Sequence, residues 1–305
     1  MDITVSVLFA LLAAAMFGVS SVLQQAAARG LGGAQPLRLG LLWQLLRRPR
    51  WVAAFGLTAL SFGVQAVALA FGPLALVQPV AATDLLFAIP LIAYRRRQRL
   101  RPADVIGGLL VAGGVALFLV LAPPSSGRVA PGTTDWLPVF LGLGAVVLVA
   151  TPAALRARPP VRTALLAGAA AATFAVVDAL TKSVVGLVGN DGASALLHWE
   201  PYVLCVVAIG GLFLGQSAFQ SGAILISLPI IDSVEPIGAV LIGATVFAER
   251  LAASPAVLAA QVLGGSVAVA GIVLLDRSPL MVSLRNDQEA SANKTSQDPI
   301  APDSG

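Results

Sequence analysis

Two acidic residues within one apolar stretch are the strongest chemical signal in the sequence. Asp232 and Glu235 are spaced to lie on one face of a helix. They lie between Pro229 and Pro236, and each proline removes a helical hydrogen bond and frees a carbonyl about one turn earlier. The two carboxylates would repel each other if both were ionised, so the pair is suited to couple proton movement to substrate movement. The structural alternative is that these acids cap broken helices or face a cytoplasmic vestibule.

A similar arrangement occurs earlier in the chain, where Asp84 follows Gln78 and Pro79 near the middle of another apolar stretch. In a membrane, a broken helix is tolerated mainly beside protein or a wet cavity. Proline-broken helices in corresponding positions therefore point to a transporter site. We predict helix breaks at Pro79, Pro229 and Pro236, and we add Asp84 and Gln78 to the candidate site.

Asp178 and Lys182 are four residues apart and share a helical face, so they can neutralise each other. One interpretation is a pair that responds to protons or to substrate. The other is a structural ion pair in which the Lys182 side chain reaches the outer interface. The sequence leaves both open.

Several glutamines lie in or at the ends of apolar helices, and they add amide groups to this set. Gln65 and Gln216 lie at nearly matching positions of the internal repeat described below. They are candidates to line a cavity, although hydrogen bonding between helices is the commoner role of such residues.

The elements that carry these residues are predicted to be membrane helices. Of the 305 residues, 57% are hydrophobic and 11% are charged, whereas about a quarter are charged in ordinary globular chains. A soluble fold of this size cannot bury so much apolar surface. The composition therefore predicts an all-α integral membrane protein and excludes a disulfide scaffold and a nucleic-acid-binding domain.

About nine segments have the roughly 20 apolar residues that a crossing needs. They are residues 3–28, 51–71, 74–94, 103–122, 136–155, 163–187, 201–220, 225–247 and 256–275. A further stretch, 37–46, is too short and is predicted to lie in the interface. The polar tail 276–305 is predicted to be disordered and cytoplasmic. Trp136, at the start of a span, is predicted to be an interface anchor.

Arginines set the expected orientation. With nine spans, the Arg-rich loops 29–50, 95–102 and 156–162 and the basic residues of the tail fall on one side. The other side carries only Arg128 and Arg250. The positive-inside rule then places the N-terminus outside and the C-terminus in the cytoplasm.

The chain also resembles itself. Gly107-Gly108 with Gly114 recurs 157 residues later as Gly264-Gly265 with Gly271, and these glycines are predicted to form close helix-packing faces. The repeat divides the chain into residues 1–122 (spans 1–4 with the interfacial stretch), 123–162 (an outer loop and connecting span 5) and 163–275 (spans 6–9). Because one connecting span separates the units, the two four-helix repeats would have inverted topology.

Two segments carry a resemblance to a known family. The first is Gly72-Pro-Leu-Ala-Leu-Val-Gln-Pro79, followed by an apolar helix, an Arg-rich turn and the glycines from Gly107. The second is the segment from Glu235 that ends in Glu249-Arg-Leu251. Together they resemble the EamA-like members of the drug/metabolite transporter superfamily and, more distantly, its NIPA-type magnesium transporters. The resemblance covers nearly all of residues 1–275 and implies export or exchange of small metabolites across a bacterial cytoplasmic membrane.

The expected function is therefore a secondary transporter, an exporter by preference, that alternates access around a central polar site. The alternative within the superfamily is a transporter of Mg²⁺ or another divalent cation, because Asp84, Asp232, Glu235 and the glutamines offer the oxygen ligands of hard cations. A non-transporting membrane scaffold is the alternative from another class. An enzyme is not expected, since the sequence lacks the His-Glu-x-x-His and Gly-x-Ser-x-Gly motifs and a phosphate-binding loop.

The expected partners are a small-molecule substrate and membrane lipid, with a homodimer left open and no nucleic acid. No cofactor, no resident metal and no catalytic residue are expected, since the chain has one cysteine, Cys205, and one histidine, His198.

Overall fold

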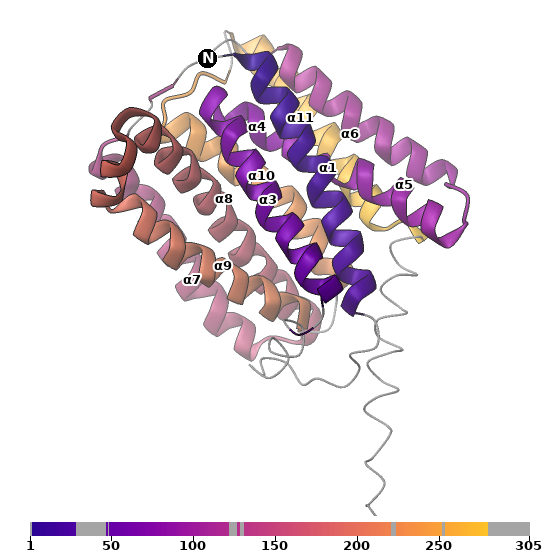
Figure 1. The fold of residues 1–305 in the computed structure, drawn as a ribbon. Coiled ribbons are helices and arrows are strands. Elements are labelled where there is room, and N and C mark those ends of the chain that lie inside the picture. Colours follow the sequence, from indigo (N-terminus) through magenta and orange to yellow (C-terminus); the bar gives the residue numbers. More distant parts are fainter. Residues whose placement is uncertain are drawn as a thin grey trace, which may run out of the picture.

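The computed structural model describes residues 2–28, 47, 49–121, 127–128, 131–220, 224–251 and 254–279 (Figure 1). All regular structure in these ranges is helical. The helices are α1 (Ile3–Ala28), α3 (Pro49–Phe71), α4 (Leu74–Ala81), α5 (Leu85–Arg96), α6 (Pro102–Val120), α7 (Thr133–Arg156), α8 (Pro159–Asp191), the short 3-10 helix η1 (Gly192–Leu197), α9 (Glu200–Gln220), α10 (Ile224–Thr245) and α11 (Pro255–Asp276).

Seven helical segments within the described ranges are long and apolar enough to cross a membrane. They are Ile3–Ser20, Val52–Phe71, Leu74–Arg95, Pro102–Val120, Thr133–Arg156, Pro160–Leu197 and Pro255–Asp276. The chain is therefore a multi-pass membrane protein, as its composition predicts. The nine expected spans all coincide with helices, but two are not among these seven. Helix α9 contributes a shorter apolar run, Glu200–Gly215, and α10 is not included, so the count of nine crossings stays a prediction.

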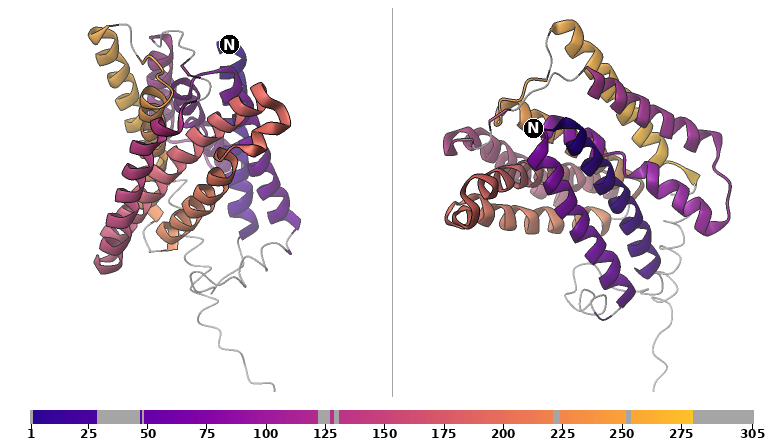
Figure 2. Two further views of the ribbon diagram at one scale, coloured as in Figure 1. Left: turned by 90° about the vertical axis from the view of Figure 1, so that its left-hand side faces the viewer. Right: turned by 45° about the horizontal axis from the view of Figure 1, so that its top comes forward.

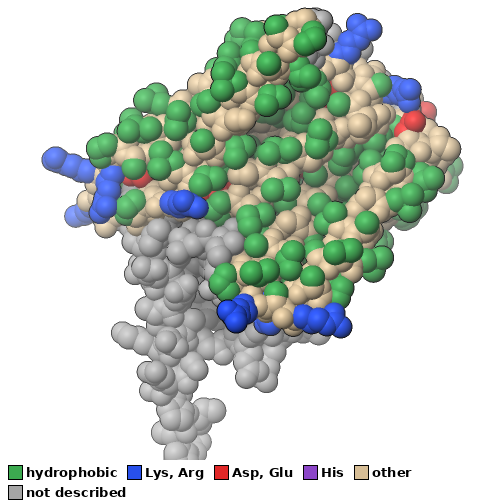
Figure 3. Space-filling view, turned by 180° about the vertical axis from the view of Figure 1, so that it is seen from behind, with side chains coloured by type: hydrophobic (Ala, Val, Ile, Leu, Met, Phe, Trp, Pro, Cys, Tyr) green, Lys and Arg blue, Asp and Glu red, His purple; other side chains and the backbone are tan. Residues whose placement is uncertain are grey.

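The outer surface of the helices is apolar. Leu109 on α6, Leu148 on α7 and Ile209 on α9 are each more than two-thirds exposed. In the face shown in Figure 3, hydrophobic side chains are spread over the helices and the Lys and Arg side chains gather toward the margins. Such a surface is stable against lipid tails, whereas in water it would be a large exposed apolar patch.

The helices pack in two similar groups. In the first, α1 packs against α3, α4 and α5; in the second, α8 packs against α9 and α10. Helix α7 lies on the outer side of α8, and α6 packs lengthwise against α11 (Figure 2). Helices α4 and α10 are in contact at the centre and join the two groups.

The contact between α6 and α11 is made by glycines, as predicted. A Cβ atom added to Gly114 would lie 2.5 Å from the carbonyl oxygen of Gly264, and one added to Gly271 would lie 2.8 Å from that of Gly107. Residue numbers rise along one helix as they fall along the other, so the two helices are antiparallel. The prediction was wrong for Gly265, which has no other atom within 4 Å of such a Cβ.

The predicted helix breaks are only partly observed. Helix α4 ends two residues after Pro79, and a turn at residues 82–84 separates it from α5. Pro229 and Pro236, in contrast, lie inside the continuous helix α10, so the prediction of breaks there was wrong. A proline removes one hydrogen bond, but the bonds of neighbouring residues can carry the helix past it.

The remaining predictions concern residues that lie outside the described ranges and the position of Trp136. The stretch 37–46 and the tail beyond residue 279 lie outside the described residues, and so does the side chain of Gln216. Trp136 is 1% exposed and packs edge-on against Trp199 and Phe247, so it is a core residue and not an interface anchor. Packing against these aromatic neighbours keeps the large ring away from the membrane interface, where a tryptophan at the start of a span usually lies.

Candidate functional site

A cavity of about 260 Å³ lies among the helices that join the two groups. Its walls come from α1, α3, α4, the turn after α4, α8 and α10. The lining residues are Phe17, Phe62, Gln65, Gln78, Ala81, Ala82, Asp84, Phe174, Val177, Asp178, Asp232, Glu235 and Pro236.

The structure brings most of the predicted site residues together at this cavity. Four carboxylates and two amides from separate parts of the sequence line it: Asp84, Asp178, Asp232, Glu235, Gln65 and Gln78. Lys182 does not line it. Pro79 lies near the end of α4, whereas Pro236 itself contributes to the cavity wall.

Asp84 is positioned by the break between α4 and α5. Its carboxylate accepts a hydrogen bond of 2.8 Å from the backbone N–H of Leu85, which begins α5. The first N–H groups of a helix have no partner within the helix, so a side-chain oxygen at this point stabilises its start. Gly18 of α1 packs close to this turn, because a Cβ on Gly18 would lie 2.4 Å from the carbonyl oxygen of Asp84.

Asp178 projects from α8, which holds it deep in the protein. The helix begins at Pro159 and Pro160, where prolines suit a first turn, and it ends at Gly192, which has a positive φ of 60°. Asp178 is 4% exposed, and Gln65 Nε2 donates a hydrogen bond of 3.3 Å to its Oδ1.

Two polar atoms beside the cavity lack partners. Asp178 Oδ2 and Gln78 Nε2 make no hydrogen bond of ordinary geometry with any described residue, although both side chains are more than 90% buried. Burying a polar group without a hydrogen bond costs about 1–3 kcal/mol in proteins. Gln78 and Glu235 nevertheless lie close enough to Asp178 to act on its carboxylate, so these polar side chains form one cluster in the cavity wall.

Asp232 and Glu235 face the cavity from α10. Glu235 lies within electrostatic range of Asp178, Asp232 and Asp84, so carboxylates from α8, α10 and the turn before α5 act on one another. None of the Lys, Arg and His residues that the structure describes belongs to the lining. The acidic side chains of the cavity can bind protons or cations.

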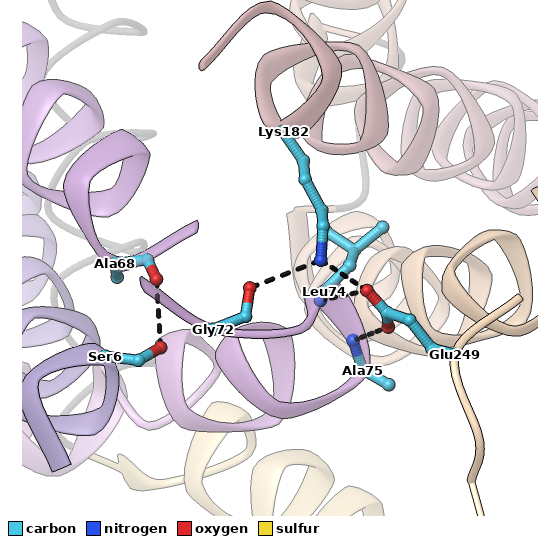
Figure 4. Close-up of polar contacts among 7 residues, drawn as sticks. All are labelled: Ser6, Ala68, Gly72, Leu74, Ala75, Lys182 and Glu249. Atoms are coloured by element: carbon cyan, nitrogen blue, oxygen red, sulfur yellow. Dashed lines mark hydrogen bonds and ion pairs between the residues drawn. The ribbon is translucent and has the colours of Figure 1, made fainter. Parts of the chain in front are cut away.

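A second buried polar cluster surrounds Lys182, four residues after Asp178 on α8, and Figure 4 shows its contacts. Lys182 Nζ forms an ion pair with Glu249 Oε1 and donates a hydrogen bond of 3.2 Å to the carbonyl of Gly72. Glu249 also accepts hydrogen bonds from the first N–H groups of α4, at 2.7 Å from Leu74 and 2.8 Å from Ala75. We call this arrangement of Lys182, Glu249, Gly72 and the start of α4 the latch.

The predicted pairing of Asp178 with Lys182 was wrong, because Lys182 pairs with Glu249 in the latch. Lys182 is 5% exposed, so it neither pairs with Asp178 nor reaches the outer interface. A buried ammonium needs several acceptors, and Glu249 and Gly72 supply them together, while Asp178 is engaged by Gln65.

Glu249 was not predicted as a buried charge, because the preceding predicted span ends at residue 247. The chain turns back there: Ala248 has a positive φ of 52°, and the N–H of Glu249 donates to the carbonyl of Gly243 at 3.0 Å. This closes the C-terminus of α10 in a way usually left to glycine. The Glu249-Arg-Leu251 ending, which carries the family resemblance, was the available signal.

Within the described part of the chain, no three or more His, Cys, Asp or Glu residues are grouped closely enough to hold a metal ion. The four carboxylates of the cavity are therefore spread around its walls.

Comparison with known proteins gives one informative relative. A Corynebacterium glutamicum protein described as uncharacterized is 32% identical over 250 residues, which cover 80% of this chain and 85% of the relative. No family model matches the chain. No solved structure matches it.

Proposed function

This chain belongs to the family of that Corynebacterium glutamicum protein, and we propose that it is a secondary transporter that moves a small solute across the membrane through the four-carboxylate cavity. The observation that carries the proposal is the convergence of Asp84, Asp178, Asp232 and Glu235 on one cavity inside a multi-pass helical protein. Charged groups within a membrane are costly and mark substrate or proton pathways.

The packing supports an inverted repeat of the drug/metabolite transporter kind. The predicted repeat relates Gly107 to Gly264 and Gly114 to Gly271. In the fold, Gly107 lies beside Gly271 and Gly114 lies beside Gly264. Exchanging the two repeats turns each of these contacts into the other, as a two-fold axis between α6 and α11 requires. Such an axis in the membrane plane relates inverted-topology repeats.

We propose that the two groups, α1 with its neighbours and α8 with its neighbours, move against each other and expose the cavity to each side in turn. The nine crossings, the outside N-terminus and the bacterial cytoplasmic membrane belong to this proposal, and so does a role in export. Carboxylates that share a cavity can exchange a proton for a cargo molecule, which would give the transport its driving force.

Magnesium transport is the second candidate, because the polar groups of the cavity are all oxygen-bearing carboxylates and amides. Mg²⁺ keeps several waters and binds through one or two carboxylates, so it does not need a compact protein cage. Apolar side chains on the wall favour an organic cargo instead.

The test begins with thermal unfolding of the purified protein against amino acids, nucleobases, organic cations, drugs and Mg²⁺, since a ligand of the folded state raises the melting temperature. Any hit is then loaded into proteoliposomes, and exchange with labelled solute outside is measured. Exchange that is lost in Asp232→Asn and Glu235→Gln supports the proposal. A stabilising ligand that wild-type proteoliposomes never exchange would contradict it.

A further inference from the structure

The lining of the cavity defines the charge of its cargo. Among the described residues, four acidic side chains and no basic ones line the space, and the nearby Lys182 is held by Glu249 in the latch. In a low-dielectric setting, each carboxylate that is ionised repels an anion strongly. Each one equally attracts a cation.

The unpaired atoms define the groups that the cargo presents. Asp178 Oδ2 and Gln78 Nε2 make no hydrogen bond of ordinary geometry with the described residues, although Gln78 and Glu235 lie close to the Asp178 carboxylate. An ammonium group supplies N–H donors to a carboxylate, and a hydroxyl, carbonyl or water oxygen can accept from the amide. Charge-assisted hydrogen bonds of this kind are about twice as strong as neutral ones.

The rest of the wall is suited to an organic molecule. Phe17, Phe62 and Phe174 line the cavity, and the rings of Phe17 and Phe62 lie edge-to-face with centroids 4.9 Å apart. Aromatic faces attract organic ammonium groups by about 0.5–2 kcal/mol. A hydrated metal dication would leave this apolar part of the wall without a matching surface. The cavity volume of about 260 Å³ corresponds to a metabolite and falls below the usual range for drug-sized ligands, which starts at about 300 Å³.

We propose that the cargo is a small organic cation whose ammonium group binds Asp178, while its apolar portion packs on the three phenylalanines. This organic-cation proposal rests on the proposed transport function, because it takes the cavity as the cargo site. Binding to the cavity can be tested separately from transport.

The experiment uses the purified full-length protein in detergent at neutral pH and three probes of the same shape: benzylamine, benzyl alcohol and benzoate, with Mg²⁺ as a fourth. Binding is measured by calorimetric titration and by the shift in melting temperature. We expect benzylamine to bind and to raise the melting temperature, and we expect benzyl alcohol and benzoate to do neither.

Variants of the protein test whether benzylamine binds at Asp178. Asp178→Asn keeps the size of the side chain and should weaken benzylamine binding at least tenfold, and Asp178→Glu should restore part of it. Asp191→Asn, at the exposed end of the same helix, should bind like the wild type. Tighter binding of benzoate than of benzylamine would overturn the proposal, as would unchanged binding in Asp178→Asn or binding of Mg²⁺ alone.

The two proposals can fail separately. If benzylamine binds at Asp178 but proteoliposomes do not exchange it or any other organic cation, the cation site stands and the transport function is contradicted. If the proteoliposomes exchange a neutral or anionic solute and benzylamine does not bind, transport stands and the organic-cation proposal is overturned.

Discussion

Two of the places where the protein buries acidic side chains lie beside α8, one helical turn apart, and they differ in how their acids are satisfied. In the latch, Glu249 has an ammonium partner and two backbone N–H donors, and its side chain is 1% exposed. In the cavity, Asp178 accepts one hydrogen bond of ordinary geometry, from Gln65, while Gln78 and Glu235 approach it without completing another.

This difference distinguishes an acid that stabilises the fold, Glu249, from an acid that can still bind a ligand, Asp178. A buried charge whose acceptor sites are filled by the protein has nothing to offer a ligand, and removing it leaves its partners unpaired. An acid with an unfilled acceptor destabilises the empty protein and is stabilised when a ligand donates to it. Four predictions test this contrast, from the largest expected effect on stability to the smallest.

The largest effect is expected for Glu249→Gln. The substitution leaves the Lys182 ammonium buried without a counter-charge, and breaking one partner of a buried ion pair costs about 3–5 kcal/mol. Thermal unfolding in detergent should show a large drop in melting temperature. The double variant Lys182→Met with Glu249→Gln should recover part of the loss, because no charge then remains unpaired. A melting temperature equal to that of the wild type in Glu249→Gln would show that the ion pair does not hold α4 and α8 together.

A smaller loss is expected for Gly243→Ala, which disturbs the latch sterically. A Cβ at Gly243 would lie 2.5 Å from Glu249 Oε2, so the carboxylate must shift away from the start of α4. Overpacking of this kind costs about 1–3 kcal/mol. Gly265→Ala is the matched control, since a Cβ there meets nothing within 4 Å and the helix is otherwise intact. Equal loss of stability in both variants would point to a general effect of alanine in these helices.

Gln65→Leu should cost less again, about 1 kcal/mol, because it removes one hydrogen bond of 3.3 Å and its acceptor already lacks a second partner. The melting temperature should fall slightly, and a cargo that binds Asp178 should bind less tightly, because the variant carboxylate is less well held in place. A fall as large as that of Glu249→Gln would mean that Gln65 belongs with the structural contacts.

Asp178→Asn should leave the stability of the ligand-free protein unchanged or raise it. The amide oxygen of asparagine can still accept from Gln65, and a buried carboxylate with an unfilled acceptor is removed. The opposite responses of Asp178→Asn and Glu249→Gln are the sharpest form of the comparison. A loss of several degrees in Asp178→Asn would place Asp178 with the latch and remove the argument that it awaits a cargo.

The sequence predicted the helices well because the signal is physical and local. Long apolar runs with charged ends place α1 and α9 within one or two residues of the expected bounds. The carboxylates of the cavity were also detectable, because an acid inside an apolar run has a high cost that must be met somewhere. Their gathering around one cavity follows from the order of the helices.

Partners between helices could not be predicted in the same way. Spacing paired Lys182 with Asp178, since both lie on one helical face, but the acid that meets Lys182 comes from a turn 67 residues further along the chain. Prolines gave an equally ambiguous signal: the break after Pro79 depends on a turn capped by Asp84, and no such break follows Pro229 or Pro236 in α10. Long-range packing decides both outcomes.

The length of α8 has a consequence for how the protein responds to its bilayer. Its 33 residues span about 50 Å at the usual helical rise, whereas the hydrocarbon core of a bilayer is about 30 Å thick. The helix must therefore tilt strongly or extend its polar ends into the headgroups. Asp178 and Lys182 are fixed to the same rod, so a change in bilayer thickness that alters its tilt displaces a wall of the cavity and one side of the latch together. Lipid acyl-chain length thus becomes a physical variable of the site.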